Sequence, residues 1–332
     1  MKKIAILLIL ALSLTFCLTS CAEMQYRVAE DMIAQGEYEA AYEALLELGD
    51  YEEAKAALEH FRYVPVRSTY EDDEEDGAIY EAEFFYNEDN LLTRVVHTGD
   101  NGKQAVAEYT YDDNGNLLTE TYVGPDGSTD TYENEYDADG NLIKASETHG
   151  GETYTWVFEY DENGRQIKET FSYPNGDVYV TEHTYDENGV IIKSIGTDAN
   201  NETGTDEYIY DEEGRLIKLE YSYPDGSTCV DEYTYDENGN LIKKVFAYGD
   251  GTQSVFDYTY DENGFLIKEK VVYYDGETWD YEYIRDEKGN AVKMVDTKVD
   301  GTQYETEIEY KLVYIPSAIS TRMDVILNFA GY

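Results

Sequence analysis

Basic side chains are scarce in this sequence, and this scarcity limits the partners that the protein can bind. The chain has 24 Lys and Arg residues against 72 Asp and Glu residues, which gives a formal charge of −48. Binding to nucleic acid requires Lys and Arg to neutralise phosphates, so this balance excludes nucleic acid as a partner. The same repulsion disfavours direct adhesion to anionic lipid headgroups.

Long apolar runs are also missing, with one short exception at the start of the chain. Lys2 and Lys3 precede an apolar run over residues 4–16, which is too short to span a bilayer as a stable helix. A positive segment followed by a short apolar run and small residues is typical of a secretory signal. We therefore expect residues 1–20 to be removed on export, which leaves 72 acidic against 22 basic residues, or −50.

Cysteine is equally rare, and one cysteine stands at the end of this signal. The run Leu-Thr-Ser-Cys that ends at Cys21 resembles the lipobox of bacterial lipoproteins. The resemblance implies a lipid on Cys21 and a place in the bacterial cell envelope, with the membrane contacted through that anchor only. The alternative is an ordinary cleaved signal with an incidental cysteine. Since Cys17 lies in the signal, Cys229 is then the only free thiol, and no internal disulfide can form.

Residues 21–70 differ in composition from the rest of the chain. Ala, Glu and Leu dominate as far as about residue 62, and the motif Gly-x-Tyr-x-x-Ala begins at Gly36 and again at Gly49. These features predict two or three short helices broken at the glycines, which serve as a spacer next to the anchor. The motif also resembles tetratricopeptide-type helical hairpins, so a peptide-binding groove is the alternative. Six consecutive acidic residues at 71–76 predict a solvated loop and a domain boundary.

Tyrosine is what this sequence has in abundance. The chain contains 35 Tyr and 10 Phe, and apolar residues make up 42% of it, so it has the material for a folded core. A tandem repeat occupies residues 71–310, in steps of 25 residues with a single step of 24. One column of the repeat reads Tyr86, Tyr111, Tyr136, Tyr160, Tyr185, Tyr210, Tyr235, Tyr260, Arg285 and Tyr310.

Each repeat carries two turn signals, separated by segments of about eight residues that are rich in Tyr, Thr, Val, Ile and Phe. The first turn is typified by Asp236–Gly239, and Asn90 takes the glycine position in the earliest copy, as expected of a left-handed residue. The second turn is typified by Pro224–Gly226. Each repeat is thus a β-hairpin. The predicted fold is mainly β: about eighteen antiparallel strands in one long twisted or coiled sheet, with a small N-terminal α-helical segment.

Alternation along the strands predicts an aromatic face and a charged face of this sheet. Tyr233 and Tyr235 share one face, whereas the residues between them point to the other. We take the turn to pair Tyr235 with Asn240, which places Ile242 on the aromatic face. A three-residue bulged loop would instead join the tyrosines to the column of Leu241, and the sequence leaves this register open.

The motif Tyr-x-Tyr-Asp-x-x-Gly-[Asn/Arg]-Leu occurs at residues 109–117, 208–216 and 233–241. It resembles the YD repeat of the rearrangement hot spot (Rhs), wall-associated and teneurin proteins. The resemblance implies a spiralling strip of antiparallel hairpins that can close into a hollow shell, and it implies carbohydrate binding at cell surfaces for the shorter relatives. Nine hairpins are few for a large shell. The chain also departs from the larger members of the family, because we see neither an autocleaving core segment nor a toxin-like C-terminal domain.

Residues 311–332 follow the array. The segment Tyr310–Ile315 has β-like composition, Pro316 ends it, and residues 319–329 predict a short helix. We interpret this end as a cap over the last edge strand, which otherwise invites pairing with another molecule.

Catalytic signals are weak. The four histidines fall in unrelated columns of the repeat, so we predict no catalytic residue, no metal site and no cofactor. The acidic turns supply oxygen ligands, but their glycine comes at the fourth position and does not reproduce an EF-hand loop. Calcium binding therefore stays open beside simple hydrogen-bonded turns.

These features predict a non-enzymatic, lipid-anchored surface protein that binds a glycan or an envelope protein through its aromatic face, since tyrosine offers a flat ring and a hydroxyl. One alternative is a purely structural spacer or shell fragment. Another is a glycan-active hydrolase, which would need one repeat to break the pattern with a polar cluster. The candidate binding residues are Trp156, Tyr208, Tyr210, Tyr233, Tyr235, Tyr258, Tyr260 and Trp279.

Overall fold

The structure is a computed structural model that describes residues 22–72 and 78–314. The chain divides into two compact units. One comprises residues up to 66, residues 86–92 and residues from 310 onward, and the other comprises residues 67–85 and 93–309. Cys21, the predicted lipidation site, lies outside the described residues, as does the helix predicted over residues 319–329.

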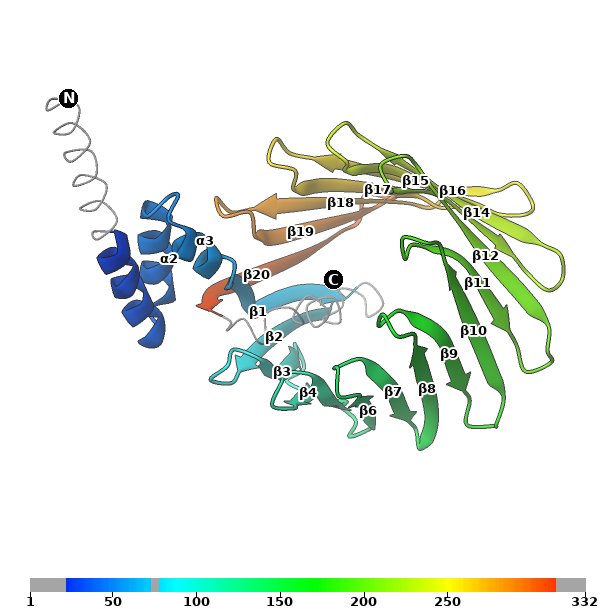
Figure 1. Ribbon diagram of the computed structural model, residues 1–332, viewed down its shortest axis with the longest axis horizontal. Coiled ribbons are helices and arrows are strands. Elements are labelled where there is room, and N and C mark those ends of the chain that lie inside the picture. The colour runs from blue at the N-terminus through cyan, green and yellow to red at the C-terminus, as the bar shows by residue number, and fades with distance from the viewer. Residues whose placement is uncertain (1–21, 73–77, 315–332) are drawn as a thin grey trace, which may run out of the picture. The chain divides into compact units, whose positions relative to one another are not determined.

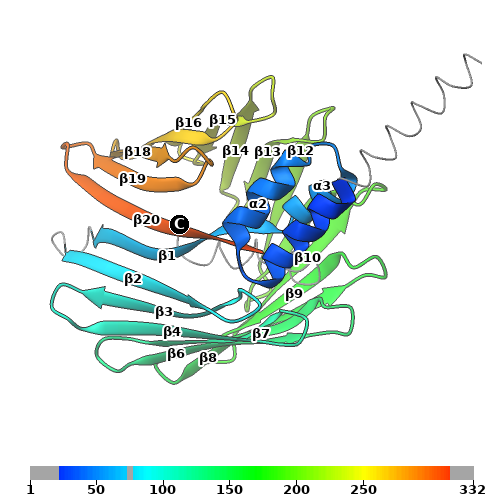
Figure 2. The same cartoon turned by 90° about the vertical axis from the view of Figure 1, so that its left-hand side faces the viewer.

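The first unit contains three short helices, as predicted (Figure 2). They cover residues 22–34, α2 (Tyr38–Glu47) and α3 (Glu52–Leu58). The breaks fall at Gly36 and Gly49, whose φ angles of 75° and 55° lie in the left-handed region that favours glycine. The buried core of this unit consists of Ala29, Ala41, Leu45, Ala54, Ala57, Phe61 and Leu312.

The rest of the described chain consists of strands joined by short turns, which confirms the predicted mainly β fold of antiparallel hairpins (Figure 1). The nine repeats form the eighteen strands β2–β19, and β1 and β20 add one strand at each end. The strands are β1 (Phe61–Asp72), β2 (Ala78–Tyr86), β3 (Leu92–Gly99), β4 (Gln104–Tyr111), β5 (Leu117–Val123), β6 (Thr129–Tyr136), β7 (Leu142–His149), β8 (Glu152–Tyr160), β9 (Gln166–Ser172), β10 (Val178–Tyr185), β11 (Ile191–Thr197), β12 (Thr203–Tyr210), β13 (Leu216–Ser222), β14 (Thr228–Tyr235), β15 (Leu241–Ala247), β16 (Gln253–Tyr260), β17 (Leu266–Val272), β18 (Thr278–Arg285), β19 (Ala291–Lys298) and β20 (Gln303–Tyr314).

The ends of the sheet differ from the prediction. Each strand pairs with the next along the chain, and β1 also pairs with β20, so the sheet closes on itself. Residues 61–70, which we assigned to the helical spacer, instead belong to β1, because their aromatic and β-branched side chains favour an extended chain. The segment predicted to begin a cap at Tyr310 continues β20 as far as Tyr314. The edge that we expected a cap to cover is therefore covered by a strand.

Both kinds of turn have the same backbone. The N–H of Asp236 donates to the carbonyl of Asn240 at 2.9 Å, and the N–H of Gly239 donates to the carbonyl of Asp236 at 3.1 Å. Equivalent bonds close the turn Tyr223–Ser227. With Gly239 at φ 88°, this is a type I turn followed by a left-handed residue. Asn90 has φ 61°, which confirms its expected place in the glycine column.

The single 24-residue step has a local cause. It falls between Tyr136 and Tyr160, where β7 and β8 are joined by a tighter turn. His149 pairs with Glu152 there, so only Gly150 and Gly151 remain in the loop, with φ angles of 59° and 85°. Two successive left-handed residues make a two-residue hairpin loop, which needs one residue fewer than the other turns.

The register that we assumed is wrong, and the bulged alternative is confirmed. Tyr235 pairs with Leu241 and not with Asn240, because the register shifts by one residue just before Tyr235. The extra residue of the bulge reverses the alternation beyond it. Ile242 consequently leaves the aromatic face and is 36% exposed.

Candidate functional site

The second tyrosine of the repeat ties neighbouring hairpins together. The hydroxyl of Tyr235 donates to the carbonyl of Leu216, at the bulge of the preceding hairpin, at 2.9 Å. Arg285 replaces tyrosine in one copy and still donates from Nε and Nη2 to the equivalent carbonyl of Leu266, at 3.1 and 2.9 Å. The same bond, between 2.6 and 3.0 Å, is made by Tyr136, Tyr160, Tyr185, Tyr210 and Tyr260.

The candidate binding residues Tyr210, Tyr235 and Tyr260 therefore carry hydroxyls that are already engaged with backbone. Tyr233 and Tyr258 belong to the first tyrosine column, two residues before the second. They are half-buried, and burial raises the pKa of each to about 12. A binding role for both columns stays a prediction. The rings of both columns, rather than the hydroxyls of the second column, are the groups that a ligand could contact.

Five rings on β8, β9 and β10 form a continuous group, which we call the first ring cluster. Trp156 stacks on Phe171 with centroids 4.7 Å apart, and Phe171 meets Tyr173 edge-on at 4.6 Å. Tyr173 lies 5.4 Å from Tyr179, and Tyr154 packs against both Phe171 and Tyr173. Tyr173 and Tyr179 are 39% and 41% exposed, so the cluster has a solvent-accessible side.

A second ring cluster, of Tyr221, Phe246, Tyr248 and Tyr274, lies further along the sheet. Phe246 meets Tyr248 edge-on at 4.6 Å, and Tyr248 lies 5.1 Å from Tyr274. Tyr221 joins the group through Phe246 at 6.2 Å. Tyr274 is 58% exposed, so this cluster also reaches solvent.

Between the two ring clusters, Gly196, Gly204, Ser194 and Asp206 form a part of the aromatic face that carries no ring. Gly196 of β11 pairs directly with Gly204 of β12, and Ser194 pairs with Asp206 on the same face. Other repeats place Phe171 or Tyr221 in the column of Gly196. A Cβ atom at Gly196 would meet nothing within 4 Å beyond its chain neighbours, so this position is open. We call His183, Ser194, Gly196, Gly204 and Asp206 the polar gap.

Hydrogen bonds order one side of the polar gap. His183 Nδ1 lies 2.9 Å from Ser194 Oγ, and its Nε2 lies 3.4 Å from the amide nitrogen of Gln166. The direction of the hydrogen bond between His183 and Ser194 depends on which ring nitrogen of the histidine carries the proton. Ser194 is 2% exposed, so its side chain is almost fully covered by its neighbours.

The two aspartates near the gap differ in their partners. Asp231 accepts from the hydroxyl of Tyr221 at 2.8 Å, and Lys244 Nζ lies 3.2 Å from its other oxygen. Asp206 has neither a hydrogen bond nor an ion pair among residues 22–72 and 78–314. Burial raises the pKa of Asp206, and the nearby His183 lowers it by a smaller amount. Asp206 is thus a half-buried carboxylate with no Lys or Arg partner, and His183 is the group that can act as its counter-charge when protonated.

The predicted binding residues are not all brought together. Trp156 belongs to the first ring cluster, and Tyr208 borders the polar gap, with its hydroxyl 3.4 Å from Ser194 Oγ. Trp279 lies on β18, away from the gap, where it stacks on Tyr281 at 6.0 Å and faces Lys298 Nζ at 4.8 Å. The sequence prediction missed the polar gap. A signal for it was present, since Gly196 and His183 stand in columns where the neighbouring repeats have rings.

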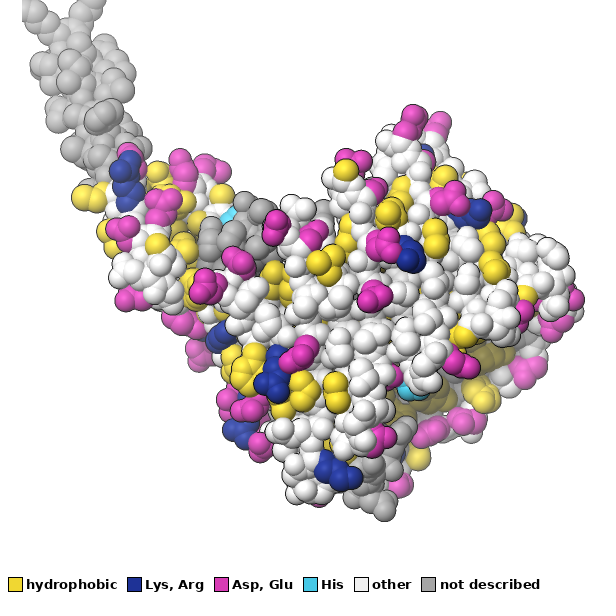
Figure 3. Space-filling model, turned by 90° about the horizontal axis from the view of Figure 1, so that it is seen from below, with side chains coloured by type: hydrophobic (Ala, Val, Ile, Leu, Met, Phe, Trp, Pro, Cys, Tyr) yellow, Lys and Arg dark blue, Asp and Glu magenta, His cyan; other side chains and the backbone are white. Residues whose placement is uncertain are grey.

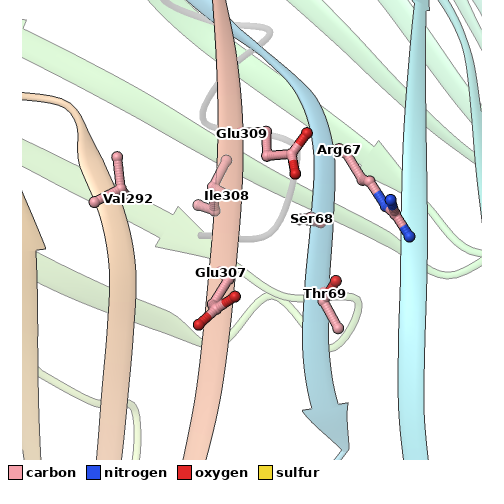
Figure 4. A pocket seen from close by; sticks show the side chains of 7 residues that line it. All are labelled: Arg67, Ser68, Thr69, Val292, Glu307, Ile308 and Glu309. Carbon is pink, nitrogen blue, oxygen red and sulfur yellow. The ribbon is translucent and has the colours of Figure 1, made fainter. Parts of the chain in front are cut away.

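A separate pocket of about 310 Å³ lies where β1 meets β20 (Figure 4). Ser68 Oγ is buried there without a hydrogen-bond partner, and Arg67 reaches away from it to Glu81 at 2.8 Å. Its lining is completed by Thr69, Val292, Glu307, Ile308 and Glu309. These mixed side chains contain no ring and no second basic group, so they define no ligand class.

The surface of the described chain reflects its charge. Acidic side chains are spread over the face shown in Figure 3, with few basic ones among them. Among the described residues, no group of His, Cys, Asp and Glu is arranged to hold a metal ion. No described helix has the length and apolar character needed to cross a membrane.

Comparisons with known proteins agree with the hairpin-repeat fold. Residues 151–279 match the family model of the Teneurin YD-shell, and residues 69–191 match a second model whose description is only an uncharacterised protein. The chain is therefore a tandem β-hairpin protein. Its repeats are of the YD type, which confirms the resemblance found in the sequence. A search of curated proteins gave no match.

Solved structures with similar folds are distant. One is a crystal structure of TcdB2-TccC3-Cdc42, at 12% identity and a TM-score of 0.24, with 72% of this chain and 19% of that chain covered. A porin-like protein from Bacteroides uniformis has 11% identity and a TM-score of 0.37, with 74% and 98% covered. A similar protein from Bacteroides vulgatus has 12% identity and a TM-score of 0.34, with 74% and 98% covered. The chain thus spans about a fifth of the first structure's matched chain, and none of these likenesses carries a functional argument.

Proposed function

We propose that this protein is a non-enzymatic, exported protein, anchored at the bacterial cell envelope through Cys21, whose hairpin-repeat sheet binds an extracellular glycan. The observation that carries the proposal is that two ring clusters flank a polar gap on a single face. Rings stack on the apolar faces of sugars, and neighbouring polar groups fix their hydroxyls. The N-terminal signal and lipobox motif support export and anchoring.

The dimensions of the face suit an oligosaccharide rather than a single sugar. The polar gap separates Phe171 on β9 from Tyr221 on β13. Four strand spacings of ~4.8 Å place these rings ~19 Å apart along the sheet. A chain of sugars lying across the strands would contact both ring clusters and the gap together.

Binding also fits the chemistry of this face better than bond cleavage does. The hydrolase alternative requires a polar cluster in one repeat, and the polar gap meets that requirement. The pair of His183 and Ser194 is the candidate for a nucleophile with its base, but Ser194 is only 2% exposed, which leaves its hydroxyl little access to a substrate. We therefore propose recognition of the glycan without turnover.

A structural role is the second candidate function. The tyrosine column that joins each hairpin to the preceding one, together with the closing pair of β1 and β20, is what a spacer or shell fragment requires. Such a protein would fold as described and bind no glycan.

The test is a glycan array probed with the exported portion, followed by calorimetry on any glycan that binds. We expect Trp156→Ala to weaken binding about tenfold or more, because a stacked ring is lost from the first cluster. Ile217 occupies the same position of its repeat as Ile242 and is exposed on the opposite face. Ile217→Ala should therefore leave binding unchanged. If no glycan binds at millimolar concentration, the spacer function replaces this proposal.

A further inference from the structure

We infer that the polar gap selects a glycan that carries a protonated amine, with Asp206 as its counter-charge. This inference rests on the proposed glycan binding and names the class of sugar: an amino sugar with a free amino group, rather than its N-acetylated form.

The first step of the argument is the missing partner of Asp206. The neighbouring Asp231 accepts a hydrogen bond from Tyr221 at 2.8 Å and has Lys244 as its counter-charge at 3.2 Å, although its Oδ1 makes no hydrogen bond. Asp206 is half-buried on the same face, and the described residues supply it with neither a hydrogen bond nor an ion pair. A carboxylate removed from water without a partner is unfavourable, so a ligand that brings a cation relieves a cost already present in the free protein.

The second step is the space beside this carboxylate. Asp206 pairs across the strands with Ser194 on one side and with Tyr221 on the other. Gly196 and Gly204 form the adjoining pair and carry no side chains. A Cβ at Gly196 would meet nothing within 4 Å, whereas one at Gly204 would meet the carbonyl oxygen of Ser222 at 3.0 Å, so the open space lies over Gly196. An amino sugar would fill a gap that other repeats fill with their own rings.

The third step is the surrounding rings. Tyr221 lies directly opposite Asp206, and Tyr208 lies on the same face next to Ser194. Aromatic faces attract cations, and this attraction adds to the ion pair when the amine is desolvated. The rings and the carboxylate of Asp206 thus both attract a positively charged ligand.

The final step excludes other ligand classes. A formal charge of −48 repels phosphorylated and uronic sugars. A neutral sugar would bury Asp206 further without compensating its charge. An N-acetylated amine carries no charge, so only the free amine supplies both the positive charge and the hydrogen-bond donors.

The experiment compares two ligands that differ in this group alone: an oligomer of glucosamine and the oligomer of N-acetylglucosamine of equal length. Calorimetry is run at near-physiological salt, which screens long-range attraction. We expect the wild-type protein to prefer the free amine about tenfold or more, and Asp206→Asn to abolish that preference. Asp257→Asn, a matched change of an exposed carboxylate on the opposite face, should retain the preference.

Gly196→Phe restores the ring of neighbouring repeats and should weaken binding of both oligomers. The added Cβ meets nothing within 4 Å, and a melting curve shows whether the variant still folds. If this variant does not fold, Asp206→Asn still decides the question, since it conserves shape.

The inference is overturned if Asp206→Asn keeps the preference, or if Asp257→Asn reduces it equally, which would indicate general charge attraction. In both cases the proposed function would still stand, provided that one of the oligomers binds and that Trp156→Ala weakens this binding. If neither oligomer binds, the proposed identity of the ligand and this inference both fail.

Discussion

At the scale of single residues, the second tyrosine of each repeat is a structural cross-link. Its hydroxyl reaches the neighbouring strand and donates to a carbonyl at the bulge of the preceding hairpin. Tyr235→Phe removes only the hydroxyl and leaves the carbonyl of Leu216 without this donor. We expect a loss of about 1 kcal/mol in unfolding free energy, measured by chemical denaturation. Tyr179→Phe, which removes an exposed hydroxyl with no described partner, should cost almost nothing; equal losses would contradict the cross-link.

The turn aspartates provide a residue-scale prediction for pH. The side chain of Arg165 donates from Nε to Asp161 at 2.7 Å and, with backbone amides, lowers the pKa of this carboxyl to about 2. A folded-state pKa below the unfolded value of about 4 stabilises the fold above that pH, and the stabilisation is lost as pH falls toward 2. The difference in melting temperature between wild type and Asp161→Asn should therefore be greatest above about pH 4 and vanish near pH 2.

Arg165→Ala is the control for this pH effect, because it removes the first cause of the shift. In that background the effect of Asp161→Asn should shrink at neutral pH. A difference that persists unchanged at pH 2 would show that Asp161 acts through its shape and not through its charge.

At the scale of elements, the hairpin depends on the left-handed residue of each turn. Gly239 has φ 88°, and a Cβ there meets nothing within 4 Å, so a substitution changes backbone strain alone. Gly239→Val should destabilise the protein by ~1 to 2 kcal/mol, because a β-branched residue resists this conformation. Gly239→Asn should cost less, as Asn90 already occupies the equivalent position. Thermal unfolding followed by circular dichroism tests both variants. A melting temperature of Gly239→Val equal to that of the wild type would contradict the turn assignment.

The elements also show what could be predicted from the sequence. Turns and hairpins depend on residues close together in the chain, so the period, the glycine columns and the strand count of the repeats were predictable. The bulge at Leu241 was not, because two registers satisfy the same hydrophobic pattern until backbone hydrogen bonds decide between them. The polar gap was missed because the pairing of β11 with β12, which sets Gly196 opposite Gly204, is a contact between strands that no single column of the repeat shows.

At the scale of the whole chain, the pairing of strands far apart in the sequence was not predicted. The pair of β1 and β20 joins segments more than two hundred residues apart, and neither carries the turn signals that mark the repeats. The sequence did identify Trp156 and Tyr208 as candidates, because aromatic residues stood out in its strands. It could not show that Trp156 and Tyr208 flank one gap whereas Trp279 lies elsewhere, since that depends on which strands are neighbours.

Intrinsic fluorescence tests the central claim, ligand recognition at the ring clusters, most directly, because the exported chain has only Trp156 and Trp279. Trp279→Phe leaves Trp156 as the sole reporter, and Trp156→Phe leaves Trp279. On titration with a glucosamine oligomer, we predict a saturable change in emission from Trp279→Phe and none from Trp156→Phe. A response confined to Trp279, or no response from either variant, would contradict recognition at this face.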